Sequence, residues 1–218
     1  SYGEAIKVEV SSDTQVRLER LDAVGAKFML HRGLLVADVK PKSGRVVQIG
    51  ADNSDALAET RDGRLHVLSD GKGTVQAAVT RGQATVTAQG KTVDVKAGFQ
   101  TAVRPGQLPQ APMVLPTSLL LKIRWPRVAV TSKRRHLITG TTNPGAQVRI
   151  GDTVVTADSR GRFQAVIVLH EGQNRVQVQA LDVLGRVKQS TSPPIELDTR
   201  APSHAVHTDP DMWTRDPE

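Results

Sequence analysis

The sequence predicts an all-β protein built of two strand-rich units, and two observations carry this prediction. Short runs of alternating apolar and polar residues, such as 6–10 and 16–21, recur along the chain and are bounded by Gly, Asp or Asn. A period of two is the pattern of a half-buried strand, because successive side chains point to opposite faces of a sheet. Four prolines between 105 and 116 divide the chain into its two strand-rich parts.

The first predicted unit covers residues 1–104. Its most regular part is 74–103, where three short alternating runs are separated by Arg81-Gly82 and Gln89-Gly90. Short strands with a turn at regular spacing occur in meanders, in sandwiches and in short β-solenoids, whose small inward residues stack from one rung to the next. The spacing leaves these three architectures open.

Residues 105–117 are predicted to be a Pro-rich linker. Proline removes backbone donors and favours the extended polyproline II conformation, so this linker should act as a semi-rigid spacer. The second unit, 118–200, consists of short alternating runs joined by turns such as Asn143-Pro144-Gly145, which is typical of a β-sandwich. Residues 201–218 form an acidic, Pro-containing tail, which is either disordered or docked on a partner.

Composition excludes several classes of function. The chain of 218 residues has no cysteine, which removes disulfides, thiolate nucleophiles and zinc ribbons. Aromatic residues make up 3%, too few for platforms that stack nucleic-acid bases, so we expect no nucleic-acid partner. No apolar run approaches the roughly 20 residues of a membrane-spanning helix. The start of the chain has no signal-peptide pattern, which favours a mature or excised fragment.

Motifs of catalysis are missing from the sequence. The six histidines form no HExxH pair, and neither a GxSxG elbow nor a Walker loop occurs. His204 and His207, close to Asp209 and Asp211, are a weak candidate for a divalent metal, and an ordinary polar tail explains them better. We therefore expect a protein that is not an enzyme, with no catalytic residue, no metal site and no cofactor.

Basic residues are concentrated in the second unit. Residues 118–200 contain 13 Lys and Arg against 6 Asp and Glu, and the whole chain carries +7. Six of these cations follow one another without an intervening acidic residue, and they are Lys122, Arg124, Arg127, Lys133, Arg134 and Arg135. Such a cluster is typical of a solvated face, or of a surface that meets an anionic partner. Trp125 lies among them, and its ring either stacks on a sugar or packs at the junction of the two units.

Two family resemblances follow from longer motifs. Residues 34–39, 74–86 and 95–98 carry a "TV…RG…TV…V.AG" rhythm that resembles the FecR-like domain over about residues 10–104, with Ala77 and Ala84 in place of branched residues. Residues 118–200 are similar to a bacterial Ig-like domain of the glucodextranase B-domain kind. The motifs that carry this similarity are 138–148, 161–163, 169–176 and 180–185. The run 198–202 resembles the usual exit from such a domain into a further part of a longer protein.

The resemblances imply a fold and a location. They imply a FecR-like β-solenoid or meander followed by an Ig-like β-sandwich, in a protein of the periplasm or another exported compartment of the bacterial envelope. We therefore expect a structural scaffold or binding module whose partners are other envelope proteins, copies of itself, anionic polysaccharide or peptidoglycan. Two alternatives remain: a FecR-type periplasmic signal transducer acting on a sigma-factor system, and a carbohydrate-binding accessory module.

Overall fold

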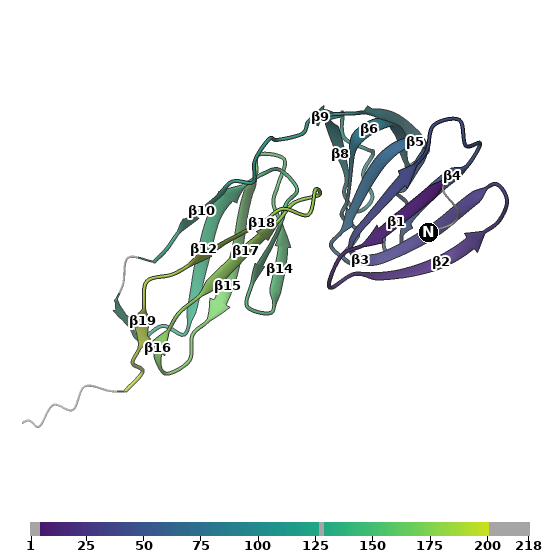
Figure 1. Ribbon diagram of the computed structural model, residues 1–218. Coiled ribbons are helices and arrows are strands. Elements are labelled where there is room, and N and C mark those ends of the chain that lie inside the picture. The colour runs from purple at the N-terminus through teal and green to yellow at the C-terminus, as the bar shows by residue number, and fades with distance from the viewer. Residues whose placement is uncertain (1–4, 127–128, 201–218) are drawn as a thin grey trace, which may run out of the picture.

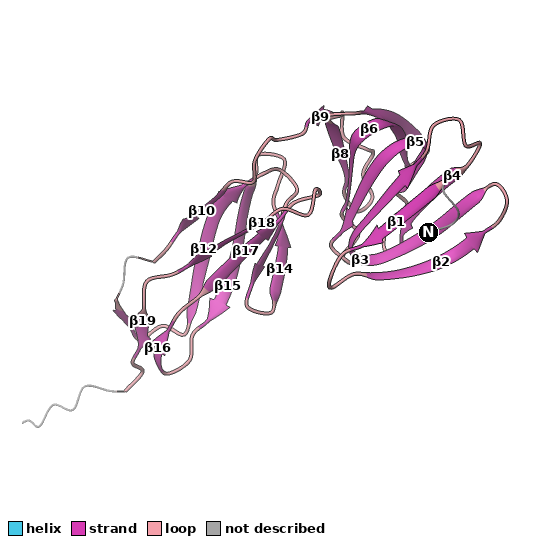
Figure 2. Ribbon diagram, in the orientation of Figure 1, coloured by secondary structure: helices cyan, strands magenta, loops and turns pink. Residues whose placement is uncertain are grey.

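The computed structural model describes residues 5–126 and 129–200, and all of their regular structure is β-strand (Figures 1 and 2). The prediction of an all-β protein is thus confirmed. The described residues contain no helix long and apolar enough to cross a membrane. The predicted acidic tail at 201–218 lies outside the described residues.

The first nine strands form one sheet with the order β1-β3-β4-β5-β6-β8-β9, to which β2 is added beside β3 and β7 beside β6. Their bounds are β1 Ile6–Val10, β2 Gln15–Leu21, β3 Gly25–Val39, β4 Val46–Ala51, β5 Leu57–Ser69, β6 Val75–Ala88, β7 Lys91–Lys96, β8 Phe99–Val103 and β9 Met113–Val114. β9 lies within the predicted linker and pairs with β8, so part of that linker extends the sheet.

The three longest strands of this sheet change partners half-way along their length. The first half of β3 pairs with β2 and β4, and its second half pairs with β1 and β5. β5 and β6 divide in the same manner, so the sheet folds over into two layers that face each other. Aliphatic side chains from both layers, including Leu30, Val47, Leu65 and Val86, are buried together in one core.

Glycine makes the corner between the layers. Gly63 in β5 and Gly82 in β6 are opposite each other in the ladder, with φ of 116° and 71°. A Cβ on Gly63 would lie 1.9 Å from the carbonyl oxygen of Arg81, so only glycine allows this approach of the two backbones. The predicted turn at Arg81-Gly82 is therefore wrong: the two runs on either side belong to the single strand β6, which bends there without leaving the ladder. Gln89-Gly90 does form a hairpin turn between β6 and β7.

The remaining ten strands form three smaller sheets around a second core. Their bounds are β10 Leu121–Arg124, β11 Val130–Thr131, β12 Arg135–Thr142, β13 Gln147–Ile150, β14 Thr153–Thr156, β15 Arg162–Val168, β16 Gly172–Asn174, β17 Gln177–Leu181, β18 Val187–Thr191 and β19 Ile195–Leu197. The sheets are β10-β12-β15, β11-β19-β16 and β14-β13-β17-β18. Inward residues such as Ile138, Val148, Phe163 and Val178 fill the space between them.

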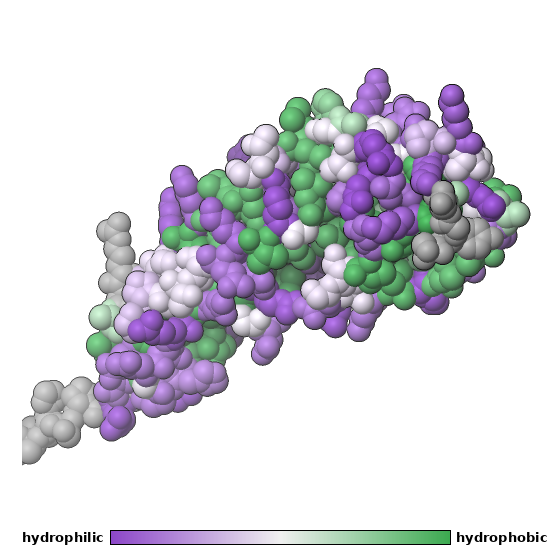
Figure 3. All heavy atoms as spheres, viewed as in Figure 1, coloured by the Kyte–Doolittle hydropathy of each residue, from purple (hydrophilic) through white to green (hydrophobic). Residues whose placement is uncertain are grey.

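The two parts of the chain pack directly against each other. Val183, in the turn between β17 and β18, is buried in one cluster with Leu34, Val36, Leu68 and Ala78 from the outer face of the first sheet. The space-filling view shows the side chains of the two parts meeting without a gap (Figure 3). We call this contact the joint; it is apolar at its centre, so the two parts do more than share a spacer.

Polar groups surround the apolar centre of the joint. Gln76 donates from Nε2 to the carbonyl oxygen of Pro144 at 3.0 Å, and Lys72 donates from Nζ to that of Val154 at 2.9 Å. Asp182 is buried and holds the 182–186 turn, because its Oδ1 accepts from the backbone N–H of Leu184 and of Arg186. The turn therefore reaches the first sheet already shaped by its own hydrogen bonds.

Candidate anion-binding face

The register of β10, β12 and β15 places the outward side chains of this sheet in rows. Lys122, Thr141 and Arg162 form the first row. Arg124, Thr139 and Gln164 form the second, Leu137 and Val166 the third, and Arg135 and Val168 the fourth. Alternate residues of these strands point inward, and among them Ile138 is fully buried. We call the outward rows the basic face.

The first two rows line an open groove with a volume of about 860 Å³. Three cations line it, Lys122, Arg124 and Arg162, together with the hydroxyls of Thr139 and Thr141, the amide of Gln164 and one carboxylate, that of Asp158. The groove therefore offers positive charge together with short-range hydrogen-bonding groups. That combination is suited to an extended anionic ligand, because charge attracts it and polar side chains orient it.

The cations of the basic face are unequally neutralised. Arg162 forms an ion pair with Asp158 at 2.9 Å, and the backbone N–H of Arg162, with that side chain, lowers the pKa of the Asp158 carboxyl. Lys122, Arg124 and Arg135 form no ion pair with any acidic residue in the described ranges. Three exposed cations on one sheet face thus have an electrostatic field that the surrounding described residues do not cancel.

The predicted cluster at 122–135 is divided by the structure. Lys122, Arg124 and Arg135 share the basic face, whereas Lys133 and Arg134 lie in the segment before β12. The Nη2 of Arg134 is 3.8 Å from the Oε2 of Glu171, whose pKa is lowered first by the backbone N–H of Thr199. Arg127 lies outside the described residues.

Trp125 is half-buried and packs against the core of its own sandwich of sheets. Sequence reasoning missed Arg162 and Gln164, which complete the groove. Their strand could be recognised from the alternation in 162–168, but its pairing with β12 could not. These two residues are about 40 positions from Lys122 and Arg124, so only the register brings the four together.

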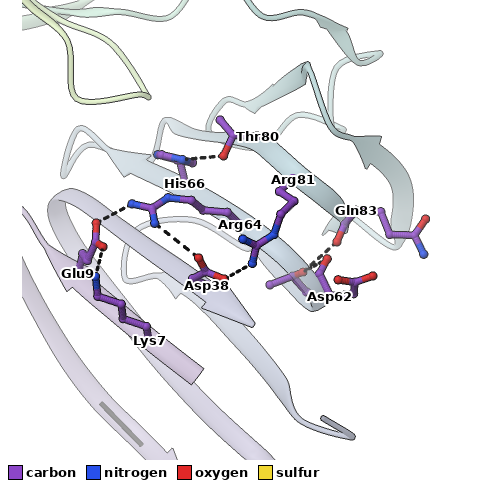
Figure 4. Close-up of polar contacts among 10 residues, drawn as sticks. Lys7, Glu9, Asp38, Asp62, Arg64, His66, Thr80, Arg81 and Gln83 are labelled. Carbon is purple, nitrogen blue, oxygen red and sulfur yellow. Dashed lines mark hydrogen bonds and ion pairs between the residues drawn. The ribbon is translucent and has the colours of Figure 1, made fainter. Parts of the chain in front are cut away.

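A second group of charges lies on the outer face of the first sheet (Figure 4). Arg64 contacts Glu9 at 2.6 Å and Asp38 at 3.5 Å, Lys7 contacts Glu9 at 2.9 Å, and Arg81 pairs with Asp38. Hydrogen bonds from Lys7 and then from Arg64 lower the pKa of Glu9. Each of these charges has an opposite partner and the network keeps a net charge of only +1, so little of its field is left to attract a ligand.

His66 lies beside this network, at the edge of the joint. Its Nε2 is 3.2 Å from the Oγ1 of Thr80, and its Nδ1 has no hydrogen-bond partner among the described residues. Burial, and after it the nearby charge of Arg64, lower the pKa of His66 to about 4 against the opposing effect of Glu9 and Asp182. The imidazole is therefore neutral at pH 7. No group of three or more His, Asp or Glu within 5–126 and 129–200 is placed to hold a metal ion.

Comparison with known proteins gives a limited result. No protein-family model and no curated protein matches this chain. Two crystal structures, each of a proposed anti-sigma factor from Parabacteroides distasonis, are similar over 50% of this chain, at 12% and 9% identity and with TM-scores of 0.41 and 0.37. The chain covers 51% and 60% of those two proteins. Similarity at this level leaves the function to be argued from the basic face itself.

Proposed function

We propose that this chain is a non-catalytic binding module of the bacterial envelope, and that its basic face holds an anionic partner. One observation carries the proposal: Lys122, Arg124 and Arg135 lie on one exposed sheet face without an acidic counterpart in the described ranges. Isolated surface cations are ordinary, but cations arranged in register on one sheet face raise the local concentration of anions. Binding of this kind needs no reactive group.

The geometry assigns different roles to the groove residues. The rows lie about 7 Å apart, because a strand rises about 3.3 Å per residue and outward residues alternate. Arg124 can offer a planar fork to a phosphate, sulfate or carboxylate group, and Lys122 acts as a point charge. The Nε and Nη2 of Arg162 already contact Asp158, so Arg162 contributes less to the ligand. Thr139, Thr141 and Gln164 lie between the cations and would hydrogen-bond the neutral parts of the ligand.

The module's location and its relatives are part of the same proposal. The FecR-like resemblance of residues 10–104 and the Ig-like resemblance of 118–200 support an exported protein that works with other envelope components, in which anionic polysaccharide and peptidoglycan are abundant. Fractionation of the source cells tests the location. Recovery of the protein in the periplasmic fraction agrees with the proposal, and recovery only in the cytoplasm contradicts it.

Binding to a soluble polyanion tests the basic face directly. We expect dextran sulfate to bind the wild-type protein in titration calorimetry, with an affinity that falls steeply as salt rises. The double variant Lys122→Gln/Arg124→Gln should weaken binding about 10-fold, because two of the cations along the groove are lost.

A matched variant controls for net charge. Lys91→Gln/Lys96→Gln removes two exposed cations from β7, on the other part of the molecule, and should change the affinity less than 2-fold. Equal losses in the two double variants would show that binding follows net charge alone, and the proposal would then be wrong.

The second candidate function is FecR-type signal transduction, in which the first sheet would contact a transporter. The sequence resemblance of 74–86 and 95–98 supports it, and these residues form β6, β7 and the turn after β7. A sigma-factor reporter that loses its response when the gene is deleted would favour this candidate over the binding module.

The carbohydrate-module alternative is weakened, because Trp125, its proposed stacking residue, packs against the core.

A further inference from the structure

The basic face also exposes aliphatic side chains that an anion would leave in water. Leu137 is 55% exposed, Val166 43% and Val168 62%. All three point outward from β12 and β15. Leu137 and Val166 form the third row, next to the row of Arg124, and Val168 shares the fourth row with Arg135. Cations therefore stand on both sides of the aliphatic residues. A soluble polysaccharide would neutralise these cations, but it would not cover the aliphatic surface.

A second groove begins at the same aliphatic residues. It has a volume of about 580 Å³ and is lined by Val166 and Val168 together with Ile150, Leu169 and Val176. Its other lining residues include two arginines, Arg149 and Arg175, and one acidic residue, Asp152. Strand β15 thus borders both grooves, with its polar half on the first and its aliphatic half on the second. Apolar and cationic surface alternate along one side of the molecule.

We infer that the partner of the basic face is the surface of a lipid bilayer rich in anionic phospholipids. This inference rests on the proposed function, since the same cations would bind the headgroup phosphates. Leu137, Val166 and Val168 would enter the zone between headgroups and acyl chains, while the long side chains of Lys122, Arg124 and Arg135 reach the phosphates around them. Burial of a few aliphatic residues and attraction by several cations together give reversible binding.

A protein partner fits the face less well. Centres of protein interfaces are enriched in Trp, Tyr, Phe, Met and Arg, and hot spots are dominated by Trp, Tyr and Arg. The outward rows of β10, β12 and β15 contain no aromatic residue and no methionine, and arginine is the only member of that set that they carry. Their apolar members are aliphatic residues beside Arg124 and Arg135, and apolar area next to cations is what binds a protein to an anionic bilayer surface.

Vesicle flotation tests the inference. We expect the wild-type protein to float with vesicles of 70% phosphatidylcholine and 30% phosphatidylglycerol, and to remain unbound with phosphatidylcholine alone. The variant Val166→Thr/Val168→Thr keeps β-branched residues suited to a strand and removes apolar contact. It should lower the bound fraction on anionic vesicles at least 5-fold and leave the affinity for dextran sulfate within 2-fold.

The control is Val114→Thr/Val187→Thr, which alters two valines that are 70% and 52% exposed elsewhere and should change neither readout. The inference is wrong if the protein binds dextran sulfate but not vesicles, or if Val166→Thr/Val168→Thr leaves vesicle binding unchanged. In either case the proposed function stands, with a soluble polysaccharide or an acidic protein as partner. If the wild-type protein does not bind dextran sulfate, the proposed function itself is wrong.

Discussion

The two outer sheet faces of this molecule both contain cations and aliphatic residues, but the contacts of these residues differ between the two faces. On the first sheet, Lys7, Arg64 and Arg81 pair with Glu9 and Asp38. The aliphatic residues of that face, Leu34, Val36, Leu68 and Ala78, are buried by the 182–186 turn and its neighbours. On the basic face Lys122, Arg124 and Arg135 have no acidic partner among the described residues, and the aliphatic residues are exposed. Charge and apolar surface are satisfied within the chain in one case and are exposed to solvent in the other.

The difference shows how an outer sheet face can be classified. A face whose charges pair and whose aliphatic residues are covered contributes to stability, since burial of apolar area and paired charges both favour the folded chain. A face whose charges are unpaired and whose aliphatic residues are exposed contributes little to folding and remains accessible to a partner. Substitutions on the covered face should therefore change stability, and substitutions on the basic face should change binding.

The largest expected effect comes from Val183→Asp, which places a charge in the joint. Val183 is 2% exposed, and a buried charge without a partner costs about 3–5 kcal/mol. The joint should open before the cores unfold, so that urea unfolding loses cooperativity and shows two transitions. Val187→Asp, at a residue 52% exposed in the following strand, is the control and should change stability by less than about 0.5 kcal/mol. A single, unshifted transition for Val183→Asp would show that the joint does not form in solution.

The second-largest loss of stability is expected at Gly63, where β5 bends between the two layers of the first sheet. In Gly63→Ala the new methyl group would lie 1.9 Å from the carbonyl oxygen of Arg81, so the β5 and β6 backbones must separate. We expect a loss of about 2–4 kcal/mol, measured by chemical denaturation. Gly44→Ala has a positive φ but no atom within 4 Å of the added carbon, and should cost about 1 kcal/mol. Equal costs at the two positions would exclude a steric role for the corner.

Alternation in the sequence was sufficient to predict the fold class and most strands, because a period of two is a local property. It could not show that a strand continues through a bend, which is why Gly82 was predicted as a turn. A glycine that ends a strand and one that bends it have the same local sequence. The distinction depends on Gly63 in the neighbouring strand, which makes room for the approach of the two backbones.

The basic face could be predicted only in part for a related reason. Lys122 and Arg124 were found because they belong to one basic run, but Arg162 and the aliphatic rows depend on which strands pair. The joint has a local signal in the sequence. Val183 and Leu184 lie in a turn between Asp182 and Gly185, and two aliphatic residues at the tip of a turn indicate a surface that docks.

Acid should lower the free energy of unfolding through His66, which lies on the outer face of the first sheet. Its pKa is about 4 in the folded chain and near 6.5 in the unfolded chain, so between these values the unfolded chain binds more protons. Stability should therefore fall as pH drops from 6.5 toward 4, by on the order of 2 kcal/mol. Denaturation at pH 7.5 and 5 measures this, and His66→Gln should remove most of the difference. A wild type as stable at pH 5 as at pH 7.5 would show that His66 is solvated in the folded protein.

The smallest effect compares one paired cation with one unpaired cation. Arg64→Gln removes the contacts to Glu9 and Asp38, whereas Arg124→Gln removes a charge that has no acidic partner in the described ranges. Exposed ion pairs stabilise only slightly, so we expect Arg64→Gln to lower Tm by about 2 °C and Arg124→Gln to leave it unchanged or slightly raised, because repulsion among the cations of the basic face decreases. Calorimetry at low salt gives both values, and 1 M salt should abolish the difference between them, since ions screen exposed charges at that concentration. If Arg124→Gln lowered Tm as much as Arg64→Gln, Arg124 would have to be satisfied within the chain, and the contrast between the two faces would fail at one of the cations on which the proposed binding depends.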